Sequence, residues 1–121
     1  MYDGDRDIVF SDFEGVRVVT LFGEWDVANR ERLHEALLSL GPDKDVVVDL
    51  RAASFFDSTA LAELIMLYKR LADGGRRLEA LVGDSNMRRL LELTSLDALF
   101  GVSAQRATYL REHLPSVATP S

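Results

Sequence analysis

One short apolar run near the middle of the chain limits the possible folds more than any other feature. Residues 45–50 read DVVVDL, with three valines and a leucine in six positions. A β-branched run of this length predicts a strand that is covered on both faces. A helical pattern with one apolar stripe follows over 58–73 and is ended by Gly74-Gly75. A buried strand followed by an amphipathic helix predicts an α/β fold.

The flanking segments continue the alternation of strands and helices. The predicted elements are, in chain order, a hairpin over 8–13 and 16–22, a helix over 26–40, the strand over 45–50, the helix over 58–73, a strand over 78–82, a helix capped by Asp84 or Ser85, and a helix over 104–113. Right-handed crossovers would arrange this order as a mixed sheet of about four or five strands, with about four helices packed on it.

Two segments are less regular. Leu96, Leu99, Phe100 and Val102 form an apolar connector, for which a short edge strand is an alternative. The composition from Pro115 onward resembles a linker. At 121 residues the chain has the usual size of one domain. We therefore expect a single domain over 1–114 and a flexible tail over 115–121.

The charge and the lack of cysteine narrow the classes of function. The formal net charge is -6, so the surface as a whole repels nucleic-acid phosphates and anionic membranes. There is no cysteine for a disulfide or a thiolate site, and no apolar stretch approaches the roughly 20 residues of a membrane span. The first residues are polar and acidic, unlike a secretory signal. We expect a cytoplasmic protein that binds neither nucleic acid nor membrane directly.

The residue types needed for catalysis are scarce. His34 and His113 are the only histidines, and both are predicted to be surface side chains. The sequence contains neither a zinc-ligand spacing nor a phosphate-binding glycine loop. A phosphoacceptor receiver domain is excluded because no lysine occurs after Lys69. The sequence therefore predicts a binding module with no catalytic residues, no cofactor and no metal site.

The start of the long helix carries the most informative motif. Asp57, Ser58 and Thr59 are favoured residues at a helix N-terminus, where a side-chain oxygen accepts a hydrogen bond from a free amide. Helix capping is one interpretation of the motif, and a regulatory site is the other. Both can hold for the same residues.

The surrounding sequence resembles a known signature. Residues 46–50, VVVDL, followed by 54–61, SFFDSTAL, are similar to the strand, loop and helix start of STAS domains, in particular of bacterial anti-sigma factor antagonists. Residues 23–26, GEWD, resemble the Gly-Glu-Leu-Asp turn of that family, and 95–100, SLDALF, resemble its connector. The resemblance spans about residues 8–114. It departs at Ala60 and Ala62, where glycines are usual.

The resemblance implies a switch. In that family an anti-sigma factor that is also a serine kinase binds the unmodified domain, so that a sigma factor is released, and it phosphorylates the serine after the aspartate. Ser58 would be the acceptor, with Thr59 as the alternative. The expected contact residues are Trp25, Asp26, Asp57, Ser58, Thr59, Ala62 and Met66. For Trp25, a place in the core is the alternative.

Three further expectations follow from the same resemblance. A phosphatase could reverse the modification, and the chain would be a monomer or a weak homodimer. The alternative function is a scaffold or adaptor subunit of a stressosome-like or lipid-transport complex that is not regulated by phosphorylation. The sequence does not identify the kinase or the sigma factor.

Overall fold

The computed structural model describes residues 7–83, 85–101 and 103–115. In this part of the chain a four-stranded sheet has the order β1-β2-β4-β6. Its strands are β1 (Ile8–Phe13), β2 (Val16–Leu21), β4 (Val46–Asp49) and β6 (Leu78–Leu81). β1 and β2 form an antiparallel hairpin, and β2, β4 and β6 are parallel. The predicted mixed α/β sheet and its opening hairpin are confirmed.

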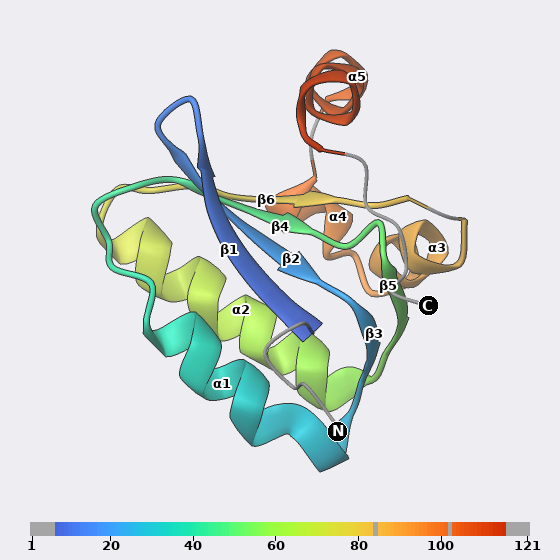
Figure 1. Cartoon of the computed structure of the whole chain (residues 1–121). Coiled ribbons are helices and arrows are strands. Elements are labelled where there is room, and N and C mark those ends of the chain that lie inside the picture. Colours follow the sequence, from blue (N-terminus) through green and yellow to red (C-terminus); the bar gives the residue numbers. More distant parts are fainter. Residues whose placement is uncertain (1–6, 84, 102, 116–121) are drawn as a thin grey trace.

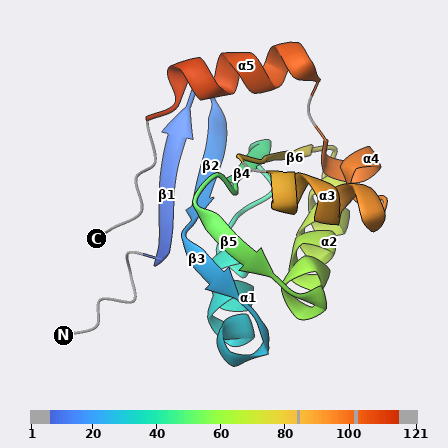
Figure 2. The ribbon, with the colours of Figure 1, turned by 90° about the vertical axis from the view of Figure 1, so that its right-hand side faces the viewer.

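Helices cover both faces of this sheet (Figure 1). α1 (Arg30–Leu38) and α2 (Ser58–Asp73) pack on one face, and α5 (Ala104–His113) lies across the other. Figure 2 shows the same arrangement from the side, with α5 on the opposite side of β1 and β2 from α1. None of the described helices is long and apolar enough to cross a membrane.

The position of β4 between two layers of helices explains its run of valines. Val46 and Val48 belong to the core beneath α1 and α2, whereas Val47 faces the smaller core beneath α5. Successive side chains of a strand point to opposite faces, so a strand covered on both faces needs apolar residues at every position. The three valines are buried, as predicted, and the last residue of β4, Asp49, is buried in an ion pair with Arg51 at 2.7 Å.

A second, two-stranded sheet was not predicted. β3 (Gly23–Trp25) and β5 (Ala53–Phe56) pair in parallel beyond the ends of β2 and β4. The sequence indicated a turn over 23–26 and a loop before the long helix, and both interpretations were wrong. Strands of three and four residues whose buried positions lie only at their ends carry too little periodicity to be recognised.

Three other details differ from the predictions. The helix expected over 26–40 starts as a 3-10 turn, η2 (Val27–Asn29), before α1. The apolar connector contains a short helix, α4 (Asp97–Phe100), and not an edge strand, while Val102 lies outside the described residues. The third helix, α3 (Ser85–Leu93), follows β6 as expected. Of the predicted tail, Pro115 is described, and its carbonyl accepts a hydrogen bond from Arg51 at 3.0 Å.

Candidate functional site

The small parallel sheet brings two acidic loops together. Trp25 at the end of β3 is in register with Phe56 at the end of β5, so Asp26 and Asp57 leave the sheet side by side. The Asp57 amide donates to the Trp25 carbonyl at 3.1 Å and extends this pairing by one residue. Figures 1 and 2 both show β3 and β5 adjacent, with β5 leading into α2. Asp26 therefore lies near the start of α2, as expected.

Each aspartate caps the helical turn that follows it. The Asp57 carboxylate accepts from the Thr59 amide at 2.9 Å and from the Ala60 amide at 3.0 Å. Asp26 accepts from the Ala28 amide at 2.9 Å, and Asn29 accepts from the Asp26 amide at 2.9 Å, which makes a capping box. These bonds satisfy amides that a helix start leaves free. The capping interpretation of Asp57 is confirmed.

Thr59 adds a further bond to the same carboxylate. Its hydroxyl donates to Asp57 Oδ1 at 2.6 Å. This hydroxyl and the Ala60 and Thr59 amides favour the charged carboxylate and hold the pKa of Asp57 below its ordinary value. The Val27 backbone amide, from the neighbouring loop, makes the smallest contribution to that lowered pKa.

Ser58 differs from both of its neighbours. It is the first residue of α2, and it is exposed. No side-chain hydrogen bond involves its hydroxyl in the described part of the chain. The hydroxyl is thus accessible, at a helix end where the backbone amides favour added negative charge.

Several apolar side chains are exposed in the segments that lead into α2 and along α2 itself. The expected contact residues Ala62 and Met66 are exposed on the same side of α2 as Ser58, with 47% of Met66 accessible. Two further exposed apolar residues were not predicted from the sequence: Val27, which is 72% exposed, and Phe55, which is 48% exposed. Val27 lies in η2, directly after Asp26, and Phe55 lies in β5, two residues before Asp57. No pattern in the sequence indicated that they would be exposed.

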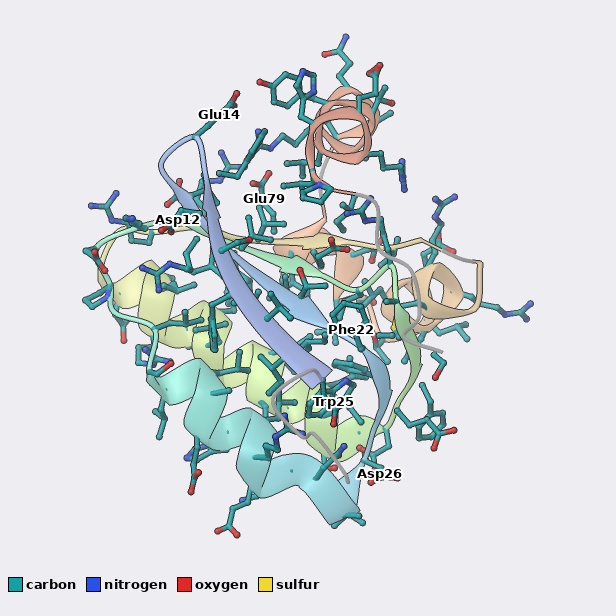
Figure 3. The ribbon with its side chains drawn as sticks, in the orientation of Figure 1. Asp12, Glu14, Phe22, Trp25, Asp26 and Glu79 are labelled. Carbon is teal, nitrogen blue, oxygen red and sulfur yellow. The ribbon has the colours of Figure 1, made fainter. Side chains whose placement is uncertain are left out.

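Of the two alternatives for Trp25, the core position is confirmed and the place on the contact surface is wrong. Its side chain is fully buried in the core that β3 shares with α1 and α2. Figure 3 shows Trp25 on the inner side of β3, whereas Asp26 marks the outer end of that strand. Alternation along β3 places these neighbours in different surroundings. Trp25 supports the loop of Asp26 from within.

A polar cluster links α1 to α2 beside the site. His34 was predicted on the solvent side, but its Nδ1 lies 2.7 Å from Oε1 of Glu63, a buried carboxylate on α2. Arg30 lies 3.9 Å from the other carboxylate oxygen. The His34 side chain therefore contributes to the contact between α1 and α2. Within the described ranges, no group of three metal-ligating side chains comes together.

The contribution of the Asp57 cap to the stability of the fold is expected to depend on pH. Because the pKa of Asp57 is lowered in the folded chain, its stabilising effect is complete above the unfolded pKa of about 3.9 and is lost as the pH falls through the lowered value. We expect Asp57→Ala to lower the urea midpoint at neutral pH, with the difference from wild type shrinking toward about pH 2.

The matched control is Asp73→Ala, at the other end of α2. This change removes a carboxylate that does not cap the helix start, so it should not lower the midpoint at neutral pH. An Asp57→Ala deficit that is as large at about pH 2 as at pH 7 would contradict the assigned cap.

Comparisons with known proteins agree with this fold. The family model described as "Mlab, STAS domain" matches residues 10–102. An anti-sigma factor antagonist from Mycobacterium paratuberculosis is 28% identical, with a TM-score of 0.70, over 86% of this chain and 92% of that chain.

Two further solved structures have lower identity and show similarity of fold. An anti-sigma-factor antagonist (STAS) domain protein from Planctomyces limnophilus is 19% identical, with a TM-score of 0.72, over 85% of this chain and 95% of that one. The Bacillus cell fate determinant SpoIIAA in its phosphorylated form is 17% identical, with a TM-score of 0.57, over 88% and 99%.

Proposed function

The chain belongs to the STAS domain family, and we propose that within it the chain acts as an anti-sigma factor antagonist that is switched off at Ser58. In the unmodified state it binds an anti-sigma factor that is also a serine kinase, and a sigma factor is released. The kinase then transfers the γ-phosphoryl group of ATP to the Ser58 oxygen, while the hydroxyl proton passes to a base of the kinase and ADP leaves. The chain is a binding partner and a substrate, and not an enzyme.

The observation that carries this proposal is the free hydroxyl of Ser58. It is exposed at the first position of a sixteen-residue helix, while the capping role beside it is filled by Asp57. A side chain that the fold does not need for capping is available for modification.

Electrostatics supports a switch that leaves the fold intact. A phosphoryl group adds about -1.5 to -2 charge and would sit at a helix N-terminus, where negative charge is stabilised. It would also add to the negative charge of Asp26 and Asp57, both partly exposed nearby. After modification the electrostatic potential at this surface would be more negative. A partner surface that is complementary to the two carboxylates alone would therefore no longer match it.

The exposed apolar side chains supply the area for docking. Val27 and Phe55 present apolar surface in the segments that carry Asp26 and Asp57, and Met66 presents it further along α2. Interfaces of this kind combine an apolar centre with charged positions that set orientation and rate of association. We expect the antagonist to bind in the cytoplasm, as a monomer or a weak homodimer, and a phosphatase to restore the unmodified form.

The proposal is tested with the anti-sigma factor kinases encoded by the source organism. Each purified kinase is mixed with the chain and ATP, and the products are mapped by mass spectrometry. We expect one kinase to add a single phosphoryl group at Ser58, and Ser58→Ala to abolish it. A matched control, Ser11→Ala, removes an exposed serine of β1 and should leave phosphorylation unchanged.

Two results would overturn the proposal. One is that none of these kinases binds or phosphorylates the wild-type chain. The other is stable assembly into a larger complex that is equally strong for wild type and Ser58→Asp, which would identify a scaffold or adaptor subunit without phosphorylation control.

A further inference from the structure

Asp57 joins the two loops beside Ser58 through its carboxylate and its backbone amide. Asp57 accepts hydrogen bonds from two amides of the first turn of α2 and from the Thr59 hydroxyl. Its own amide donates to the Trp25 carbonyl at 3.1 Å, and the Val27 amide contributes to the lowered pKa of Asp57. Asp57 therefore connects the first turn of α2, which carries the exposed Ser58 hydroxyl, with the end of β3, after which the exposed side chain of Val27 follows.

We propose that Thr59 is a positioning residue, whose hydroxyl fixes the Asp57 carboxylate and thereby the arrangement of Val27 and Ser58 that a partner meets. This inference rests on the proposed function for its docking consequence, but its structural part can be tested without any partner. It also assigns different roles to two adjacent hydroxyls that the sequence left as alternative acceptors.

The geometry separates the two hydroxyls clearly. The Thr59 hydroxyl is only partly exposed and is committed to a 2.6 Å bond with a charged acceptor. A bond to an ionised group is about twice as strong as a neutral one, so freeing this hydroxyl for phosphoryl transfer has an added cost. The Ser58 hydroxyl has no such bond and is exposed.

The shape of threonine is also suited to this role. Its β-branched side chain has few rotamers, so the hydroxyl is kept toward the preceding carboxylate. Thr59→Val keeps that shape and removes the donor, whereas Thr59→Ser keeps the donor. An effect that is seen in Thr59→Val and is absent in Thr59→Ser would be due to the loss of the hydroxyl and not to a change in packing.

The first measurement is an NMR titration of the Asp57 carboxyl carbon, together with the shift of the Val27 amide. We expect Thr59→Val to raise the pKa of Asp57 toward its ordinary value and to move the Val27 amide resonance, because the largest cause of the lowered pKa is gone. Thr59→Ser should return both to wild-type values. Thr108→Val, on exposed α5, is the matched control and should change neither.

The second measurement is the rate of Ser58 phosphorylation by the kinase that modifies the wild-type chain. We expect Thr59→Val to slow the reaction about tenfold, because small errors in the position of a reacting group are costly. Thr59→Ser should be close to wild type, and modification should stay at Ser58 in every variant that retains it. Circular dichroism should be unchanged throughout.

The outcomes separate this inference from the proposed function. An unchanged pKa of Asp57 in Thr59→Val overturns the inference, as does phosphorylation of Thr59 or an unaltered rate at Ser58. If no kinase modifies the wild-type chain, the proposed function fails, and the titration alone then decides whether Thr59 holds Asp57 in place.

Discussion

Replacing Trp25 with alanine is expected to lower the free energy of unfolding by about 3–5 kcal/mol, the usual cost of removing a large aromatic side chain from a core. Trp25 is fully buried, and its contacts join β3 to the core beneath α1 and α2. The cavity left by the Trp25 side chain at β3 would also loosen the loop that carries Asp26. The change should thus affect both stability and the site.

The measurement is chemical denaturation followed by circular dichroism, since Trp25 is the only tryptophan and its fluorescence disappears with the substitution. Val27→Ala, two residues away on the surface, is the matched control and should change stability by less than about 0.5 kcal/mol. A Trp25→Ala variant as stable as Val27→Ala would mean that this side chain does not occupy the core.

Ser58→Asp is expected to weaken binding to the anti-sigma factor about 100-fold, which corresponds to about 2.7 kcal/mol. The physical reason is that a third carboxylate beside Asp26 and Asp57 repels the surface that two carboxylates attract. Stability should be preserved, because an acidic residue in the first turn of α2 interacts favourably with the helix end.

Two variants separate the charge at Ser58 from other effects. Gln105→Glu adds one negative charge on exposed α5, on the opposite face of the sheet, and should leave affinity unchanged. Ser58→Ala removes the hydroxyl without adding charge, so it should bind within a few-fold of wild type. Equal weakening by Ser58→Ala and Ser58→Asp would show that the hydroxyl itself makes the contact and that charge is not the switch.

The sequence predicted those parts of the fold that carry strong periodicity. β4 has a run of apolar residues that is typical of a strand covered on both faces. α2 has an apolar stripe along about four helical turns, with a capping motif before it and two glycines after it. Such elements are defined by many residues at once. Both were predicted with bounds that differ from the structure by one residue at most.

The parts that were missed depend on contacts between distant segments. β3 exists because β5 pairs with it, and neither is long enough to show alternation by itself. The same pairing turns Trp25 inward, which decides between the two positions that the sequence left open for it. Val27 and Phe55 are exposed, and the sequence did not indicate either of them. The bond between Thr59 and Asp57 was also missed, because residue types alone do not show which hydroxyl is already occupied.

The central claim is that a single accessible hydroxyl at the start of α2 decides whether a partner docks. The most direct test is isothermal titration calorimetry of one anti-sigma factor kinase with two preparations of the full chain, unmodified and quantitatively phosphorylated at Ser58. We predict a saturable exothermic or endothermic isotherm for the unmodified chain and none at the same concentrations for the phosphorylated chain. Equal affinity of the two preparations would contradict the claim.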